Sequence, residues 1–290
     1  MWVNKDWEDY ELIDTSAGRR LERWGEHILV RPDPQVLWKG TERDPRWKRA
    51  DAVYTRSKAG GGNWNDNKIP ESWQIKCGSL AFNLKLMGFK HVGLFPEQKI
   101  NWDWFSELIR KRIAEGGKQP KVLNLFAYTG GSTVAAAAAG AAVCHVDASK
   151  GITAMAKDNI RINGLADAPV RYIVDDCVKF VEREIRRGNL YDAIILDPPS
   201  YGRGPGGEVW KLEDSIDQLV TLTSQVLSDD PLFYLLNSYS AGISANTMKY
   251  IVELRICSAK GGRASADEIG LEVTNGKHVL PCGSSARVVF

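Results

Sequence analysis

The sequence predicts an α/β protein with a doubly wound, mainly parallel sheet of seven strands and a small β-rich N-terminal domain. Two observations predict the sheet. From residue 121 onward, short apolar runs alternate with segments of helical period, and a glycine-containing turn follows the first run. A third observation separates the N-terminal part, because residues 1–95 are rich in tryptophan and broken by glycine and proline. The two predicted domains are therefore residues 1–95 and 96–290.

The composition of the chain is that of a folded protein. Its 290 residues are 43% apolar, which is ample for a buried core. It has no run of about 18 apolar residues, and the N-terminus lacks the apolar stretch of a signal peptide, so we expect no membrane segment. The cysteines have no CxxC spacing and do not cluster with the four histidines. We therefore expect a cytoplasmic protein with reduced thiols and no metal site.

Residues 1–95 are predicted to form a small, irregular β domain. Turn-forming residues separate its apolar runs, among them the triple glycine at residues 60–62. Seven of the ten tryptophans fall here, where large aromatic side chains compensate for a thin core. The predicted strands are residues 11–14, 22–30, 52–55, 73–77 and 80–86.

The positive charge of the chain is concentrated in this domain. Residues 1–95 hold 16 Lys and Arg against 13 Asp and Glu, a net charge of +3, whereas the whole chain carries +2. Within residues 39–58 seven basic side chains accompany three acidic ones, and Trp38, Trp47 and Tyr54 lie beside or among them. Basic side chains among aromatic ones suit a phosphate backbone with unstacked bases. The alternative is a solvated charged face whose tryptophans anchor the small core.

From residue 121 the predicted strands and helices alternate regularly, after a helix that carries one apolar stripe. The stripe is Trp102, Phe105, Ile109 and Ile113, at spacings of three and four residues. Strands are predicted at residues 122–126, 143–146, 170–174, 192–196 and 232–237, and helices at residues 151–163, 177–187, 213–228 and 244–256, after a first one that ends at residue 140. Such alternation means a mainly parallel sheet with helices on both faces. Two further strands, residues 269–273 and 286–290, are expected to form an edge hairpin.

Residues 121–140, KVLNLFAYTGGSTVAAAAAG, have the pattern of a first strand, a ligand-binding turn and a first helix. Gly130 and Gly131 carry no Cβ, so the backbone of the turn can approach a ligand closely, and the following helix points its N-terminus at that ligand. Ser132 or Thr129 is expected to cap this helix. The same pattern also occurs in purely structural βα units.

Three more features follow at the carboxyl ends of the next strands. Asp147 ends the second strand, where one carboxylate can accept hydrogen bonds from both hydroxyls of a ribose. Asp175, Asp176 and Cys177 follow the third strand, and DPPSY, residues 197–201, follows the fourth. Each feature has a structural alternative, such as a helix cap or a strand-ending turn. Four of them at one sheet edge nevertheless favour a ligand site.

With these features in place, the chain resembles the class I S-adenosylmethionine-dependent methyltransferases, which have a Rossmann-like fold. More narrowly, it is similar to the ribosomal-RNA methyltransferases that modify large-subunit RNA at cytosine C5 or guanine N7, whose first motif reads much like VLNLFAYTGG. The resemblance extends over residues 89–237 and includes GLFPEQ at residues 93–98. It implies an enzyme that uses S-adenosylmethionine and methylates a base of RNA.

The resemblance also implies two sets of site residues. The cofactor-binding set is Phe126, Ala127, Tyr128, Thr129, Gly130, Asp147, Ala148, Ser149, Asp176, Cys177, Asp197 and Gln98. The catalytic set, which would form the wall between the methyl group and the target base, is Asp197, Pro198, Pro199 and Ser200. Residues 126–130 would contact the methionine part, and Asp147 the ribose. Asp176 and Cys177 would lie at the adenine edge, and Gln98 would either roof the cofactor or only join the two domains.

Methyl transfer from a sulfonium group makes few chemical demands on the protein. The methyl group is already activated, so the enzyme mainly aligns donor and acceptor and excludes water. The rigid Pro198 and Pro199 fix backbone carbonyls beside the transfer site, and a flanking Asp or Ser can orient a base. Methylation at cytosine C5 would need a cysteine nucleophile, and neither DPPSY nor NSYSAG, residues 237–242, contains one. A ring or exocyclic nitrogen is therefore favoured over C5.

Three other functions compete with this interpretation. A nicotinamide-dependent oxidoreductase would share the strand, turn and acidic residue, but GxGxxG is absent and DPPSY has no role in hydride transfer. A non-catalytic RNA-binding protein would keep the basic segment without needing a complete cofactor edge. A methyltransferase acting on a small molecule or a protein is the strongest rival. The sequence assigns neither the methylated atom nor an oligomeric state.

Overall fold

The computed structural model describes residues 1–290 except 41, 58–60, 67–68, 204–208 and 277. Lys58 of the basic segment and Gly60 of the triple glycine therefore lie outside the described residues. Packing divides the chain into two compact units. Unit 1 comprises Met1 and residues 100–269 and 283–290, and unit 2 comprises residues 2–99 and 270–282. The chain thus enters unit 2 a second time near its C-terminal end.

Unit 1 is built on a sheet to which the described residues contribute seven strands. These are β9 (Lys121–Leu125), β10 (Ala142–Asp147), β11 (Val170–Val174), β12 (Ala193–Leu196), β15 (Phe233–Ser238), β16 (Arg263–Val273) and β17 (His278–Val289), of which the last two also contribute residues to unit 2. Their order is β11-β10-β9-β12-β15-β17-β16. The first five are parallel and β17 is antiparallel to β15, which confirms the predicted doubly wound, mainly parallel sheet.

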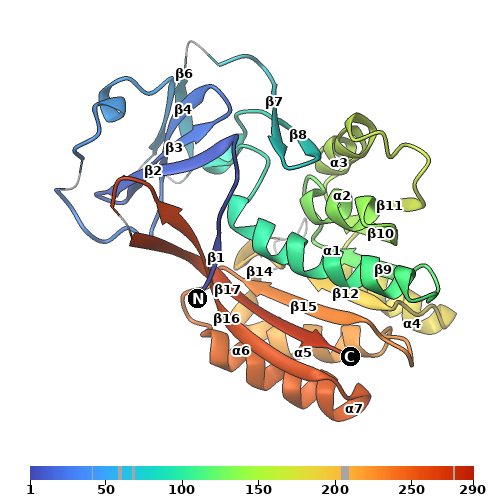
Figure 1. Ribbon diagram of the computed structural model, residues 1–290. Helices are drawn as coiled ribbons and strands as arrows, with labels where there is room; N and C mark the ends of the chain where they lie inside the picture. Colours follow the sequence, from blue (N-terminus) through green and yellow to red (C-terminus); the bar gives the residue numbers. More distant parts are fainter. Residues whose placement is uncertain (41, 58–60, 67–68, 204–208, 277) are drawn as a thin grey trace. The chain divides into compact units, whose positions relative to one another are not determined.

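Helices cover both faces of this sheet (Figure 1). One face carries α1 (Lys99–Ala114), α2 (Gly131–Ala138) and α3 (Lys150–Ile162), and the other carries α4 (Cys177–Arg187), α5 (Leu212–Ser224) and α6 (Ala245–Val252). A π-helical turn, Glu253–Cys257, and the short α7 (Ser258–Lys260) follow α6. The π turn interrupts the single helix predicted over residues 244–256.

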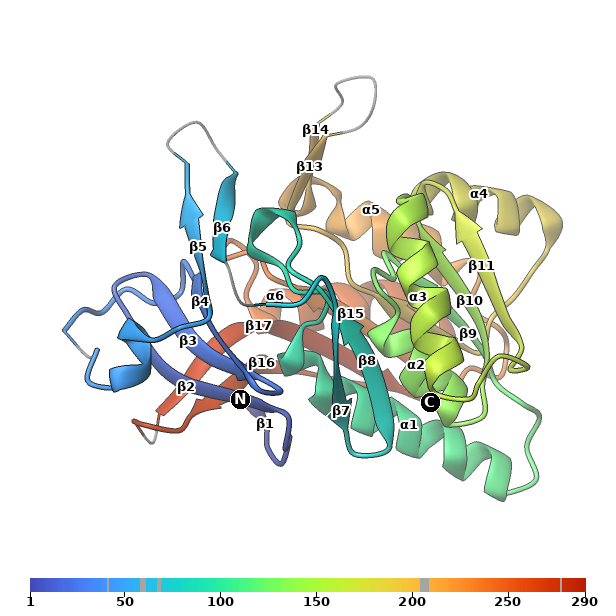
Figure 2. The ribbon, with the colours of Figure 1, turned by 90° about the horizontal axis from the view of Figure 1, so that it is seen from above.

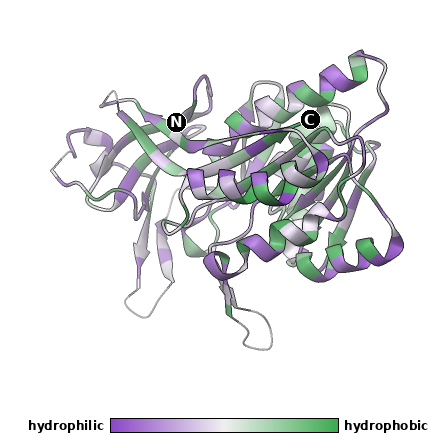
Figure 3. Ribbon diagram, turned by 90° about the horizontal axis from the view of Figure 1, so that it is seen from below, coloured by the Kyte–Doolittle hydropathy of each residue, from purple (hydrophilic) through white to green (hydrophobic). Residues whose placement is uncertain are grey.

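The helices of unit 1 follow from capping residues and apolar spacing. In α4, the Asp176 carboxylate accepts a 2.9 Å hydrogen bond from the Lys179 amide and so caps the first turn. The helix ends at Gly188, which has the left-handed backbone (φ 67°) that glycine adopts without strain. Phe180 and Val181 point into the core formed with the sheet. Figure 3 shows this amphipathic pattern, with hydrophobic and hydrophilic residues alternating along the helices.

Unit 2 is a β structure with short 3₁₀ turns. Its strands are β1 (Trp2–Asn4), β2 (Tyr10–Ser16), β3 (Arg19–Trp24), β4 (His27–Pro32), β5 (Ala52–Arg56), β6 (Gly62–Asp66), β7 (Trp73–Cys77) and β8 (Leu80–Leu84), with 3₁₀ turns at Pro45–Lys48, Gly88–Lys90 and Pro96–Gln98. β2 to β6 are neighbours in sequence order, and β7 pairs only with β8 among the described residues (Figure 2). Ile13, Leu21 and Val30 form a small core against which Trp47 packs.

The structure corrects five details of the predicted elements. Residues 22–30 are not one strand but parts of β3 and β4, which turn at Gly25 with φ 65°. The glycine-rich stretch leads into β6, and residues 201–211 contain the short strands β13 (Tyr201–Arg203) and β14 (Val209–Lys211), where only a loop was expected. The last two strands are longer than predicted. Finally, neither Ser132 nor Thr129 caps α2, because the cap position is Gly130 and has no side chain.

Candidate active site

The four predicted features of unit 1 meet at one edge of the sheet. β9 lies between β10 and β12, and β11 lies beyond β10, all in parallel register. Leu125 pairs with Val146 and with Leu196, and Asp147 pairs with Val174. The four segments that follow these strands therefore begin at the same level, at the carboxyl edge where ligands bind in open α/β sheets.

The turn after β9 has an unusual backbone. Phe126 and Tyr128 have φ angles of 55° and 50°, which non-glycine residues rarely adopt, and Gly130 has φ 84°. A Cβ at Gly130 would also lie 2.9 Å from the Cβ of Ala156 on α3, so glycine is required there. Hydrogen bonds hold the turn in place, among them one of 2.9 Å from the Asn159 amide group to the Thr129 carbonyl. Backbone strain maintained in this way is typical of ligand-binding sites.

Asp147 connects the turn to the second strand. Its Oδ2 accepts a 2.9 Å hydrogen bond from the Tyr128 amide, and its Oδ1 accepts one of 2.9 Å from the Ser149 amide. Burial raises the pKa of Asp147, and these two backbone hydrogen bonds oppose the rise. Ser149 caps α3 by accepting a hydrogen bond from the Ile152 amide. Asp147, the residue predicted to bind the ribose, thus has a half-buried carboxylate at the end of β10.

Asp176 and Cys177 lie at the end of β11, beside the turn. Asp176 caps α4, and its side chain is exposed to solvent. The Cys177 side chain is only 3% exposed, and its Sγ accepts a hydrogen bond from the Phe126 amide at 3.2 Å. Burial raises the pKa of Cys177 to about 12, so it remains a neutral thiol at physiological pH. The buried Cys177 therefore stabilises the turn through its hydrogen bond with Phe126. Of the two residues, only Asp176 has an exposed polar side chain.

The segment after β12 is fixed through its carbonyl groups. The Pro199 carbonyl accepts a 2.7 Å hydrogen bond from the indole of Trp210, and the Ser200 carbonyl accepts one of 3.1 Å from the Leu212 amide at the start of α5. The Trp210 ring also lies 6.0 Å, centroid to centroid, from the ring of Phe126. One residue thus contacts both the predicted catalytic wall and the predicted methionine turn. Sequence reasoning missed Trp210 because no local pattern marks it.

A buried polar chain lies beneath the turn. The Thr133 hydroxyl accepts a 2.9 Å hydrogen bond from the Asn124 amide group and lies 2.9 Å from Nδ1 of His145. Burial lowers the pKa of His145 to about 4, so the ring is neutral at physiological pH. Trp102 of α1 donates a 3.1 Å hydrogen bond to the hydroxyl of Ser132 on α2. These contacts join α1 to α2, and α2 to β9 and β10 of the sheet.

One predicted cofactor-binding residue, Gln98, belongs to unit 2, whereas the other predicted site residues belong to unit 1. Gln98 is buried in the 3₁₀ turn of unit 2, and its part in cofactor binding stays a prediction. Within the described residues, no group of three or more His, Cys, Asp and Glu side chains is arranged to hold a metal ion. None of the helices in that part of the chain is long and apolar enough to cross a membrane.

The fold and the strand-end site together define a class I methyltransferase, and comparison with known proteins gives the same result. The model of the S-adenosylmethionine-dependent methyltransferase family matches residues 50–221. The chain therefore belongs to this family, and S-adenosylmethionine is its cofactor. A crystal structure of the SAM-dependent methyltransferase from Agrobacterium tumefaciens is 36% identical with a TM-score of 0.90, covering 99% of this chain and 92% of that one.

A less similar structure has the same fold, and curated sequence relatives match about half of this chain. The structure of SMU.776 complexed with SAH has a TM-score of 0.71 at 20% identity and covers 98% of this chain and 76% of that one. The ribosomal RNA large subunit methyltransferase K/L of Shewanella baltica is 35% identical over 137 residues, which are 47% of this chain and 17% of that protein. The corresponding protein of Pseudoalteromonas translucida is 32% identical over 154 residues, 51% of this chain and 20% of that protein. The chain thus spans a fifth or less of these curated relatives.

Proposed function

We propose that this methyltransferase transfers the methyl group to a base of RNA, with ribosomal RNA as the substrate class. The observation that carries the proposal is the 35% identity to a ribosomal RNA methyltransferase over nearly half of the chain. The basic residues of unit 2 support it, because a phosphate backbone requires such charges. The five cysteines are all free thiols, which supports action in the reducing cytoplasm.

The cofactor edge has groups suited to each part of S-adenosylmethionine. When bound, the cofactor supplies a methyl group already activated by the positive sulfur. The strained turn at residues 126–130 would hold the methionine part, because α2 starts at this turn without a side-chain cap and leaves its first N–H groups for a carboxylate. Asp147, flanked by Ala148 and Ser149, would accept hydrogen bonds from the ribose hydroxyls. Asp176 would lie at the adenine edge, with Cys177 packed beneath.

The wall at residues 197–200 would position the target base. Pro198 is buried and Pro199 is exposed, so the segment is anchored on one side and open on the other. The two proline rings restrict the backbone, and the hydrogen bond from Trp210 to the Pro199 carbonyl restricts it further. Such a wall would exclude water and hold the base in line with the methyl group.

The cysteines favour transfer to a ring or exocyclic nitrogen over cytosine C5. C5 chemistry needs a thiolate that attacks the pyrimidine ring. Burial raises the pKa of Cys144 to about 11 and that of Cys177 to about 12, so neither is an available nucleophile. Cys77 and Cys282 are buried in unit 2, and Cys257 lies in the π turn after α6. None of the five lies in residues 197–201 or 237–242.

A methylation assay tests the proposal. The purified protein is incubated with tritium-labelled S-adenosylmethionine and, separately, with ribosomal RNA, cell protein and a small-molecule extract. We expect label in RNA, and mass spectrometry of the digested nucleosides should identify a base methylated on nitrogen. Label confined to protein or to small molecules would overturn the RNA assignment, and 5-methylcytosine would overturn the assignment to nitrogen.

A further inference from the structure

Unit 2 contains a cavity of about 680 Å³ beside the basic segment of the sequence. We call it the Trp38 cavity. Its lining residues come from β2, from the segment after β4, from β16 and β17 and from the turn between those two strands, and they include Asp14, Thr15, Trp38, Arg43, Asn275 and His278. All of these residues belong to unit 2. The volume lies within the range of small-ligand sites.

Trp38 is the aromatic residue of this segment that is available for a ligand. Tyr54 is buried, and Trp47 packs on the core of unit 2 and donates its indole N–H to Asp14. Trp38 is 41% exposed, yet its indole N–H donates hydrogen bonds of 3.1 Å to the carbonyl and the hydroxyl of Thr15. The ring is therefore oriented by its polar edge while much of its apolar surface stays open. A fixed, exposed indole is suited to stacking on a planar base.

The charges around the Trp38 cavity favour an anionic ligand. Arg43 lines the cavity and is exposed, and no ion pair engages it within the described residues. The Asp14 carboxylate is occupied, because its two oxygens accept hydrogen bonds from the Trp47 indole and the Thr15 amide. Between residues 38 and 49 there are five basic residues against two acidic ones. An incoming phosphate would meet a positive field there.

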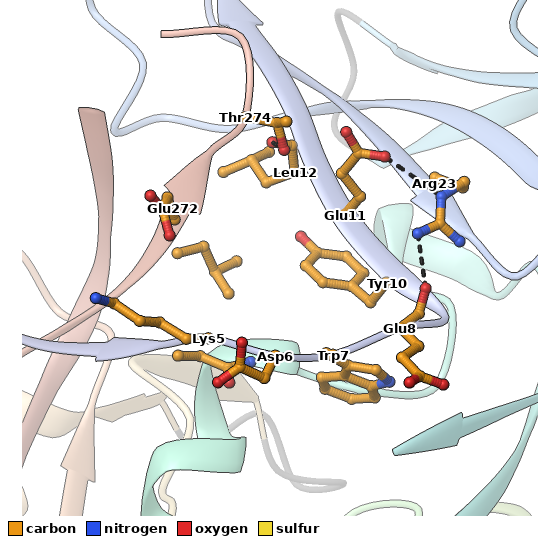
Figure 4. Close-up of a pocket in the computed structure, with 12 residues that line it drawn as sticks. Lys5, Asp6, Trp7, Glu8, Tyr10, Glu11, Leu12, Arg23, Glu272 and Thr274 are labelled. Carbon is orange, nitrogen blue, oxygen red and sulfur yellow. Dashed lines mark hydrogen bonds and ion pairs between the residues drawn. The ribbon is translucent and has the colours of Figure 1, made fainter. Parts of the chain in front are cut away.

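A second cavity of unit 2 has the opposite character. It has a volume of about 590 Å³, and Figure 4 shows the carboxylates of Asp6, Glu8, Glu11 and Glu272 around it, with Lys5 and Arg23 as its basic residues. Arg23 is already engaged, since it donates hydrogen bonds to Glu11 and to the Glu8 carbonyl. This acidic cavity would repel a phosphate backbone. A residue of this cavity therefore provides a negative control for RNA binding.

We propose that the Trp38 cavity binds one unstacked base of a single-stranded RNA segment, with Trp38 stacking on the base and Arg43 contacting the adjacent phosphate. The proposal rests on the proposed function, because it specifies how the RNA substrate is held. It places an RNA contact in unit 2 that is distinct from the methyl-transfer edge of unit 1. Stacking tolerates any base, whereas the phosphate contact depends on salt.

Fluorescence anisotropy with a single-stranded RNA oligonucleotide tests this proposal. We expect Trp38→Ala to bind about 5- to 150-fold more weakly, the range for loss of one stacked base, and Trp38→Phe to recover most of the affinity. Arg43→Ala should weaken binding and lower the salt dependence. Two controls outside the cavity, Phe89→Ala for an exposed aromatic residue and Lys5→Ala for a basic one, should bind like the wild type. Thermal unfolding of each variant shows whether it is folded.

An abasic scan of the oligonucleotide separates stacking from a general loss of structure. At one position, removal of the base should weaken wild-type binding while leaving Trp38→Ala binding unchanged. Wild-type affinity in folded Trp38→Ala and Arg43→Ala, together with RNA methylation by the wild type, would overturn the cavity assignment alone. A wild type that neither binds nor methylates RNA would overturn the proposed function and the cavity assignment together.

Discussion

The carboxylate of Asp147 accepts a hydrogen bond of 2.9 Å from the backbone amide of Tyr128. Tyr128 has a left-handed backbone conformation, so this bond holds a strained residue of the cofactor turn to the neighbouring strand. The same carboxylate accepts a hydrogen bond from the Ser149 amide at the start of α3. Asp147 therefore shapes the turn, in addition to its proposed role as a hydrogen-bond acceptor for the ribose, and its replacement should affect both properties.

Asp147→Ala should weaken S-adenosylmethionine binding by about 1.5–3 kcal/mol, the scale of lost hydrogen bonds to a charged group. Isothermal titration calorimetry measures the difference. Asp158→Ala is the matched control, because Asp158 is an exposed carboxylate on α3 paired only with Arg161 among the described residues. Unchanged affinity in a folded Asp147→Ala protein would remove this residue from the site.

Replacement of all five cysteines by alanine or serine should leave a measurable methylation rate. Nitrogen transfer needs no covalent thiol, although the buried positions of Cys144 and Cys177 make a loss of stability expected. Cys257→Ser, at the least buried of the five cysteines, is the control for effects of substitution and purification alone. If one single replacement abolished activity in a folded protein that still binds the cofactor, covalent C5 chemistry would be favoured instead.

Lys48 and Arg49 should carry phosphate contacts, whereas Arg46 should not. Arg46 forms a bidentate pair with Asp44, at 2.9 and 2.8 Å, and so is already neutralised. Lys48 and Arg49 are exposed, and neither has an ion pair among the residues that the structure describes. The double variant Lys48→Ala, Arg49→Ala should flatten the log-log salt dependence of RNA binding by about 1.4 units, at about 0.7 per contact on a single strand.

Filter binding at several salt concentrations gives this slope. Arg46→Ala should leave it nearly unchanged. The matched control is the double variant Arg110→Ala, Lys111→Ala, which removes two exposed basic residues of α1. An equal flattening by that control would show that net charge alone, and not the segment in unit 2, determines the salt dependence.

Stability should fall in acid because of Glu22. Burial disfavours the charge on Glu22, but Arg31, at 2.6 Å, and Arg20 overcome this and lower its pKa to about 2. The unfolded value is near 4.5. The stabilisation is therefore complete above about pH 4.5 and is lost as the pH falls toward 2. Urea unfolding between pH 7 and pH 2.5, followed by fluorescence, measures this loss.

Glu22→Gln should remove this part of the acid dependence. It should also destabilise the protein by about 3–5 kcal/mol at neutral pH, because the buried Arg31 loses its counter-charge and the buried Arg20 keeps only Asp33 of its two acidic partners. Glu42→Gln is the matched control, since Glu42 pairs with Arg19 at the surface and should contribute at most about 1 kcal/mol. Equal effects of the two variants would contradict the role assigned to the buried pair.

The parts of the fold that could be predicted from the sequence are those fixed by local periodicity. β11 and α4 have the predicted bounds, because an apolar strand is followed by a capping aspartate, an amphipathic run and a terminating glycine. The β3–β4 hairpin was missed because charged side chains continue through the turn at Gly25. β16 and β17 were predicted too short because many of their residues are polar. These residues are hydrogen-bonded in the sheet, but they do not form the apolar pattern from which a strand is predicted.

The candidate site shows the same division. Asp147 and the glycine turn were predictable because strand ends in a parallel sheet converge whatever the rest of the chain does. Trp210 was not, since its contact with Pro199 depends on how residues 201–211 fold back. The buried state of Cys177 likewise follows from tertiary packing, and the sequence alone did not separate it from the exposed Asp176 beside it.

Unit 1 is built from separate segments of the chain, and this affects how it folds during synthesis on the ribosome. Ala286 and Val288 are fully buried in its core, and β17 is the strand that pairs with β15. At about 5–20 residues per second, roughly 3–10 s separate the synthesis of residue 238, the end of β15, from that of residue 289, the end of β17. During this interval the edge of β15 has no neighbour. The nascent chain should therefore depend on chaperones, and a fragment that stops before residue 263 should aggregate when it is expressed.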